Sequence, residues 1–163
     1  MRVYIPATVP MLRQFVESGE LAPVTGTAFA LTPALRESYA AGDTEELEYA
    51  AMLDAARASL RLLAADEKAE PRRAVLAVDM DDVTLRPELD FSVVKVGGSF
   101  TLKDVASVHL DTAEAEQDVR AAADVIDAAD LGDPDAEFAL GSAEDHELAW
   151  YAAQELPFVL ELL

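Results

Sequence analysis

The sequence predicts a mixed α/β (α+β) domain, with a sheet of about five strands and helices packed on it. Short runs that alternate apolar and polar residues, or that are continuously apolar, predict strands, and longer runs with apolar residues three and four apart predict helices. Glycines and prolines fall between these runs, where turns are expected. A chain of 163 residues corresponds to one ordinary domain, so we expect residues 1–163 to form a single globular domain.

Two strand–helix units open the chain. Predicted strands at residues 2–8 and 25–31 are each followed by a threonine and a proline, the pattern of a capped helix start, at Thr8 with Pro10 and at Thr32 with Pro33. Strand–helix alternation favours parallel neighbouring strands. If these two strands are parallel, both helix N-termini lie at one edge of the sheet, where anions and other ligands often bind. The alternative is that both threonines are ordinary caps.

The longest predicted helix covers residues 43–65. Asp43 followed by Glu46 is a capping-box pattern, which marks the start of the helix. Its apolar residues cover a wide surface, so we expect burial on more than one side; they are Leu47, Ala50, Ala51, Leu53, Leu60, Leu62 and Leu63.

The second half of the chain begins with three closely spaced strands, and this spacing predicts antiparallel pairing. The strands cover residues 74–79, 91–98 and 107–111. A helix is expected from about Thr112 to Asp130, followed by a loop or short turn over residues 131–138. A last helix is expected to begin near Ser142 and to close the chain.

Acidic residues dominate the composition: 32 Asp and Glu against 12 Lys and Arg give a formal net charge of −20. Binding to nucleic acid or to an anionic membrane requires clustered Lys and Arg, and Arg72 with Arg73 is the only adjacent pair. We therefore expect no nucleic-acid binding and no membrane binding. The charge suits a protein partner with a basic surface, although solubility alone is a simpler role for it.

The absence of cysteine excludes disulfides, thiolate metal sites and a cysteine nucleophile. No apolar run approaches the roughly 20 residues that span a bilayer, and the first residues lack the pattern of a signal peptide. We expect a cytoplasmic protein without a cofactor.

Residues 141–157, GSAEDHELAWYAAQELP, raise the question of a site near the end of the chain. Ser142 with Asp145 three residues later is a capping-box arrangement, and Glu144 lies beside it. Acids in the first turn of a helix face the positive end of its dipole. The pattern is therefore typical of a well-capped helix start.

The same segment holds one of the two histidines and the only tryptophan. The alternative to a capped helix is an acid–histidine site in which His146 combines with an acid of the long helix, such as Glu46 or Glu48. Trp150 and Tyr151 suit a partner surface, because aromatic residues are enriched there, although core packing is the simpler interpretation. The candidate ligand or interaction residues are Glu144, Asp145, His146 and Trp150.

The string AVLAVDMDDVTL has the most enzyme-like pattern in the chain. An apolar strand ends at Asp79, and Asp81 lies two residues later. This resembles the first motif of the haloacid-dehalogenase-like phosphotransferases. The resemblance implies a magnesium-dependent reaction in which Asp79 attacks phosphorus and Asp81 protonates the leaving group. The later residues that it implies are Ser99 or Thr101, Lys103, Asp133 and Asp135.

Several features depart from that family. The motif lies in the middle of the chain instead of on a first strand, and Asp82 replaces the usual glycine after the second acid. Acids after a strand are also common in turns. Asp79 and Asp81 therefore remain candidates for an alternative function. His109, in a short strand, is interpreted as a hydrogen-bonded structural residue.

Three longer segments carry a second resemblance: RVYIPAT, ALTPALRESY with EELEYAAMLDAARASLRLLA, and AEDHELAWYAAQELP. They resemble a family of small uncharacterised proteins from high-GC Gram-positive bacteria, and the resemblance implies a cytoplasmic single-domain protein without an assigned activity. The missing catalytic set and the acidic charge favour a non-enzymatic binding or protein-interaction domain. The alternative is the phosphotransferase, and nothing in the sequence determines the oligomeric state.

Overall fold

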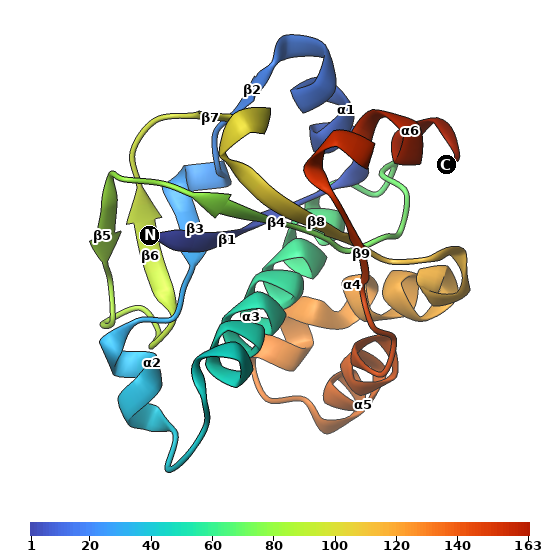
Figure 1. The fold of residues 1–163 in the computed structure, drawn as a ribbon. Coiled ribbons are helices and arrows are strands. Elements are labelled where there is room, and N and C mark those ends of the chain that lie inside the picture. Colours follow the sequence, from blue (N-terminus) through green and yellow to red (C-terminus); the bar gives the residue numbers. More distant parts are fainter.

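Seven strands form one antiparallel sheet in the order β5-β6-β3-β1-β4-β8-β9 (Figure 1). The structure, a computed structural model, describes all 163 residues. The strands are β1 (Arg2–Ala7), β3 (Thr27–Phe29), β4 (Ala74–Asp79), β5 (Val83–Leu85), β6 (Val93–Val96), β8 (Val105–Leu110) and β9 (Ala149–Tyr151). A small second sheet pairs β2 (Glu20–Leu21) with β7 (Phe100–Thr101).

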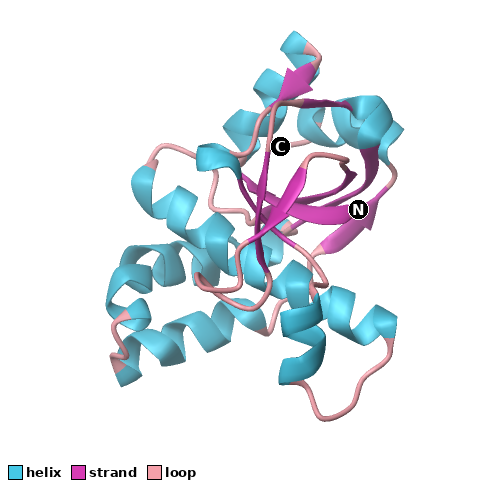
Figure 2. Ribbon diagram, turned by 90° about the vertical axis from the view of Figure 1, so that its left-hand side faces the viewer, coloured by secondary structure: helices cyan, strands magenta, loops and turns pink.

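The chain forms six α-helices, which lie on both sides of the large sheet (Figure 2). They are α1 (Val9–Ser18), α2 (Pro33–Ser38), α3 (Thr44–Ala65), α4 (Glu116–Asp130), α5 (Pro134–Glu144) and α6 (Leu156–Glu161). None of these helices has the length and apolar character needed to cross a membrane. The predicted mixed α/β class is confirmed. The sheet has more strands than the predicted five, because β5 and β9 join the predicted ones.

The expected parallel pairing in the first half is wrong. Strand β1 pairs with β3 in antiparallel orientation, with Tyr4 opposite Phe29. After α1 the chain forms β2 and a 3-10 turn over Val24–Gly26 before it enters β3. Because β1 and β3 run in opposite directions, Thr8 and Thr32 lie at opposite ends of the sheet and create no shared ligand site.

Both threonines nevertheless cap their helices. The Thr8 hydroxyl accepts a hydrogen bond from the Met11 amide at 3.4 Å, and the Thr32 hydroxyl accepts one from the Leu35 amide at 3.0 Å. Asp43 likewise caps α3 through a bond from the Glu46 amide at 2.9 Å. The three predicted helix starts are therefore correct, since a side-chain oxygen at the cap satisfies an amide without an intrahelical partner.

Successive side chains along β1 point into two different apolar cores, one on each face of the sheet. Val3 and Ile5 of β1 pack against Leu12 and Phe15 of α1, in a cluster that also contains residues of α6. Tyr4, between them in sequence, faces the opposite side and packs in a cluster with residues of α3. This two-residue period follows from strand geometry, and it assigns α1 with α6 to one face and α3 to the other.

Helix α3 contacts both the sheet and the other helices on its side. Ala51 and Ala55 pack in the cluster with Tyr4, whereas Leu60 and Leu63 pack with residues of α4 and α5. The expected burial on more than one side is therefore confirmed for Ala51, Leu60 and Leu63. Leu53, predicted to be apolar surface of the same kind, is 40% exposed.

The last predicted helix is wrong. Helix α5 begins at Pro134, with Asp133 as its N-cap, inside the segment expected to be a loop. It ends at Glu144, so the residues predicted to start a helix finish one instead. The chain then crosses to the sheet and forms β9, which pairs with β8 at the edge. Ser142 makes no N-cap bond, because its hydroxyl donates back to the Phe138 carbonyl of the same helix.

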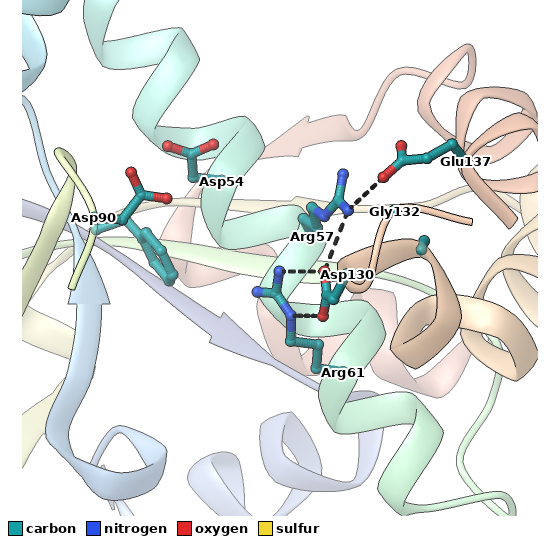
Figure 3. A pocket seen from close by; sticks show the side chains of 9 residues that line it. Asp54, Arg57, Arg61, Asp90, Asp130, Gly132 and Glu137 are labelled. Carbon is teal, nitrogen blue, oxygen red and sulfur yellow. Dashed lines mark hydrogen bonds and ion pairs between the residues drawn. The ribbon is translucent and has the colours of Figure 1, made fainter. Parts of the chain in front are cut away.

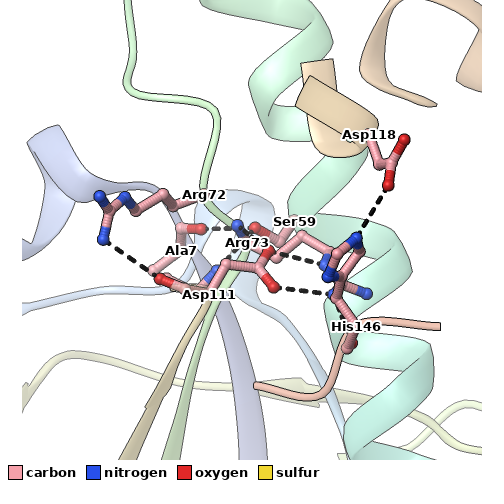
Figure 4. Close-up of polar contacts among 8 residues, drawn as sticks. Ala7, Ser59, Arg72, Arg73, Asp111, Asp118 and His146 are labelled. Carbon is pink, nitrogen blue, oxygen red and sulfur yellow. Dashed lines mark hydrogen bonds and ion pairs between the residues drawn. The ribbon is translucent and has the colours of Figure 1, made fainter. Parts of the chain in front are cut away.

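A buried ion pair joins these elements where β4 begins and β8 ends (Figure 4). Arg73 and Asp111 are 2% and 1% exposed. The Arg73 backbone amide and its Nε both donate to Asp111 Oδ2, and Nη2 donates to Oδ1, each at 2.8 Å. Nη2 also donates to the carbonyl of His146, in the connection between α5 and β9, at 2.8 Å. One guanidinium therefore holds β4, β8 and the approach to β9 together.

Ser59 connects α3 to the same end of the sheet. Its buried hydroxyl donates to the Ala7 carbonyl at 2.7 Å and accepts from the Ala74 amide at 3.1 Å. These two backbone groups lie where β1 ends and β4 starts. Because a buried backbone group without a partner costs free energy, this serine fixes the position of α3 along the sheet.

Replacing Asp111 with alanine should lower the free energy of unfolding by about 3–5 kcal/mol, because the change leaves a buried guanidinium without its counter-ion. Asp79→Ala is the matched control. It removes an arginine–aspartate pair whose side chains are 42% and 60% exposed, and such pairs contribute at most about 1 kcal/mol. Urea denaturation followed by circular dichroism measures both variants. Equal losses would show that the buried pair stabilises the fold no more than a surface pair does.

Candidate functional site

Three hollows of ligand size lie against α3, and two of them are larger than the third. The first, about 500 Å³, lies between α3 and the α4–α5 connection (Figure 3). Arg57 and Arg61 of α3 point across it toward Asp130 and Glu137. The hydrogen bond and charge of Arg61 hold the pKa of Asp130 below its usual range.

The arginine side chains of this first hollow bind acids of the chain itself. Arg61 donates two bonds to Asp130, at 2.8 and 3.0 Å, and Arg57 donates to Asp130 and Glu137 at 3.2 and 3.1 Å. Asp54, on the other side, accepts a bond from Ser92 at 2.6 Å, and burial raises its pKa. We interpret this cluster as the ionic junction that holds α3 to α4 and α5.

The second hollow, about 630 Å³, lies between the first turns of α3 and the strands β1, β4, β8 and β9. This volume is within the range of ordinary ligand pockets, roughly 300–1,000 Å³. Aromatic and ionisable side chains line it, including Tyr4, Glu45, Glu48, Tyr49, His109 and Trp150. We call this concavity the aromatic hollow.

Strand register explains why these residues meet. Tyr4 of β1 lies opposite Ala77 of β4, and Ala77 lies opposite Ser107 of β8. Two residues after Ser107 in the same strand, His109 of β8 lies opposite Trp150 of β9. The small Ala77 therefore lies between Tyr4 and Ser107 in the lining of the hollow.

A β-bulge in β8 aims the polar residues into the hollow. Ser107 pairs with Ala77 while Val105 pairs with the next residue, Val78, so that Ala106 is the extra residue. A bulge of this kind shifts the side-chain alternation by one position. It allows Val105 to join the apolar core on the opposite face while Ser107 and His109 line the hollow.

Two hydrogen-bonded pairs set the charges at one side of the hollow. The Tyr4 hydroxyl donates to Glu48 Oε2 at 3.1 Å, and burial together with the Glu48 charge raises the pKa of Tyr4 to about 12. Arg2 donates to Asp79 at 2.8 and 3.3 Å. Since Asp79 neutralises Arg2, the carboxylates of Glu45 and Glu48 leave the hollow with net negative charge.

His109 and Ser107 form the polar floor near β9. The Ser107 hydroxyl and His109 Nε2 are 2.9 Å apart, and burial lowers the pKa of His109. The ring is therefore neutral near pH 7. The expectation of a hydrogen-bonded residue agrees with this contact, but sequence reasoning missed its position in a hollow.

The structure separates the four terminal candidates. Trp150 is 62% exposed on the rim of the hollow, whereas Tyr151, next in the strand, packs against the core on the other face. His146 lies outside the hollow, and its Nε2 is 2.8 Å from Asp118 Oδ2 of α4. The expected partners Glu46 and Glu48 are wrong for His146. Glu144 and Asp145 are exposed at the end of α5.

The proposed phosphotransferase residues have other contacts. Asp79 binds Arg2, and the hydrogen bond from Arg2 holds the pKa of Asp79 below its usual range. Asp81 is exposed in the turn between β4 and β5. Asp133 caps α5, and Thr101 forms a capping box with Asp104 at a 3-10 turn. The chain contains no group of three or more His, Asp or Glu side chains placed to hold a metal ion.

Sequence reasoning nominated Trp150 but missed Tyr4, Tyr49 and Ser107. Ser107 and His109 are two apart in a predicted strand, so they share a face, and this signal was available. Tyr4 and Tyr49 have no such signal, because their position in the hollow depends on the strand order and on the place where α3 crosses the sheet.

The ring protons of His109 should titrate in NMR with a midpoint below the ordinary histidine value of 6.5. Because the folded-state pKa is lower than the unfolded one, His109 contributes stability above pH 6.5 that is lost as the pH falls toward the folded-state value. His109→Gln should therefore show a smaller fall in the free energy of unfolding below pH 6.5 than the unmodified protein. A midpoint at or above 6.5 would contradict the buried, neutral ring.

One family of proteins matches the sequence of this chain. The family model described as a family of unknown function (DUF6912) matches residues 1–160. No curated protein matches the chain, and no solved structure matches it. The match covers nearly the whole chain, from β1 through α6, and the aromatic hollow falls inside it. The chain belongs to the DUF6912 family.

Proposed function

We propose that this protein is a non-enzymatic binding domain and that a positively charged segment of a partner protein enters the aromatic hollow. The observation that carries the proposal is the combination of exposed aromatic rings and excess negative charge around one concavity. Aromatic faces attract cations through the ring quadrupole. Carboxylates at the same rim add Coulomb attraction, so a cationic segment has both kinds of contact there.

The charge of the whole chain supports the same class of partner. A net charge of −20 attracts a basic surface over distance and raises the rate of encounter. The same charge opposes nucleic acid and anionic membranes, which carry the same sign. The partner that we propose is therefore a protein with a basic surface.

The polar groups of the hollow support binding over catalysis. A nucleophilic serine needs a base that is itself oriented by a third group. The only side-chain hydrogen bond of the His109 ring is to Ser107, so no third group orients His109 as a base. The high pKa of Tyr4 keeps its hydroxyl protonated, so this residue does not act as a base near pH 7. Neither the family match nor any relative supports the phosphotransferase alternative.

We also propose a cellular location and a source for the protein. The low lysine content and the many alanines fit a GC-rich genome, and the resemblance to small proteins of high-GC Gram-positive bacteria supports a cytoplasmic protein of that group. We also propose that residues 1–163 act as one globular domain, because the polar network around Arg73 connects strands from both halves of the chain.

Trp150, the only tryptophan, reports directly on binding in the hollow. Short peptides of equal length that carry basic, neutral or acidic side chains can be titrated while tryptophan emission is measured. Basic peptides should change the emission in a saturable way, and neutral and acidic peptides should not. Binding should weaken as salt rises from about 0.1 M to about 1 M, because the Debye length falls from about 10 Å to about 3 Å.

Charge-removing variants locate the effect. Glu45→Gln and Glu48→Gln should each weaken basic-peptide binding by up to about fivefold, the range of exposed ion pairs. Glutamine at position 48 keeps an acceptor for the Tyr4 hydroxyl. Glu17→Gln, an exposed position of α1 on the opposite face, is the matched control and should bind normally. Equal affinities for basic and neutral peptides would overturn the proposed function.

A further inference from the structure

We infer that the cation which enters the aromatic hollow is the guanidinium group of an arginine side chain of the partner protein. This inference rests on the proposed function and goes further, because it names the chemical group that the hollow selects.

The lining residues offer more acceptors than donors. Glu48 uses Oε2 for the Tyr4 hydroxyl, which leaves Oε1 for a ligand. Glu45 is exposed at the rim, so its carboxylate is accessible to a ligand. The Arg2 donors Nε and Nη2 are already directed at Asp79. A ligand that matches this set carries several donors and no acceptor, and guanidinium has five N–H donors and no acceptor.

The aromatic residues give the hollow two exposed faces on separate elements. Tyr49 of α3 is 48% exposed and Trp150 of β9 is 62% exposed, and both line the same concavity. Each side chain is attached to regular secondary structure, so its backbone is fixed before a ligand arrives. A planar cation can lie against such a ring while its edge remains free to bond to a carboxylate.

Arginine fits this combination better than lysine does. A lysine ammonium is a compact and strongly hydrated charge, whereas guanidinium is planar, weakly hydrated and able to bond to a carboxylate through two parallel N–H groups. In the hollow, the aromatic rings bind a planar, weakly hydrated cation more favourably, and the carboxylates of Glu45 and Glu48 bind a group with paired donors more favourably.

The neutral floor of the hollow is consistent with a cationic ligand. His109, which lies opposite Trp150 across the β8–β9 pair, is bonded to Ser107 and carries no charge near pH 7. A protonated ring there would repel the guanidinium. Its neutral form adds an apolar surface beside the tryptophan without opposing charge.

The test is isothermal titration calorimetry of the whole protein with four ligands. Three are peptides of one sequence that differ at a single central residue, which is arginine, lysine or the neutral arginine analogue citrulline. The fourth is free N-acetyl-arginine amide. We expect the arginine peptide to bind about fivefold or more tightly than the lysine peptide and about tenfold or more tightly than the citrulline peptide, since bonds to charged groups are roughly twice as strong as neutral ones.

Two variants connect this preference to the aromatic rings. Trp150→Leu and Tyr49→Leu keep apolar side chains at exposed positions and remove one aromatic face each. Either change should reduce the preference for arginine over lysine by about twofold to fivefold, the range of a cation–π contact at an exposed site. Glu17→Gln should leave the preference unchanged. If both leucine variants keep the full preference, the assignment to this hollow is wrong.

The ligand series separates the two proposals. Equal binding of the arginine and lysine peptides, both tighter than citrulline, would overturn the guanidinium inference and leave the proposed function intact. Equal binding of the arginine and citrulline peptides, or no binding by any peptide, would overturn both. If N-acetyl-arginine amide binds as tightly as the arginine peptide, the hollow takes a small guanidinium compound, and the protein partner is wrong.

Discussion

The buried pair of Arg73 and Asp111 is the constraint on which the arrangement of the sheet depends. Burying two charges costs several kcal/mol for each ion unless their donors and acceptors are matched. Here three bonds of 2.8 Å join the two residues, and a further donor reaches the carbonyl of His146. The ion pair is therefore satisfied only when β4, β8 and the chain leading to β9 occupy their observed positions.

The aromatic hollow follows from this arrangement. Strand β9 is only three residues long and pairs with a single neighbour, so its own ladder fixes it weakly. The connection that precedes β9 is held twice, by Arg73 at the His146 carbonyl and by Asp118 at the His146 ring. These contacts set where β9 begins, and therefore where Trp150 faces His109 and forms the wall of the hollow. The histidine that the sequence nominated for a ligand site positions that wall instead.

Local signals predicted the starts of α1, α2 and α3 and the mixed class, because caps and apolar periods act within a few residues. Asp133 and Pro134 repeat the cap-and-proline pattern of Thr32. The start of α5 was therefore also predictable, although the segment was predicted to be a loop. Strand direction and order could not be predicted, since β1 pairs with β3 and β4 across long separations in the chain. Trp150 was identified as a candidate from its residue type. The rest of the hollow depends on register, on the bulge in β8 and on where α3 crosses the sheet.

Native-state hydrogen exchange of Arg73→Lys tests most directly whether the buried pair positions the wall of the hollow. Lysine keeps the positive charge but has a single nitrogen in place of the planar guanidinium, whose Nε and Nη2 together bond both oxygens of Asp111 and the His146 carbonyl. If the buried pair positions β9, the backbone amides that pair β8 with β9 exchange faster in the variant, and by a larger factor than those that pair β3 with β6. Equal acceleration in both regions, or no acceleration at β9, would contradict it.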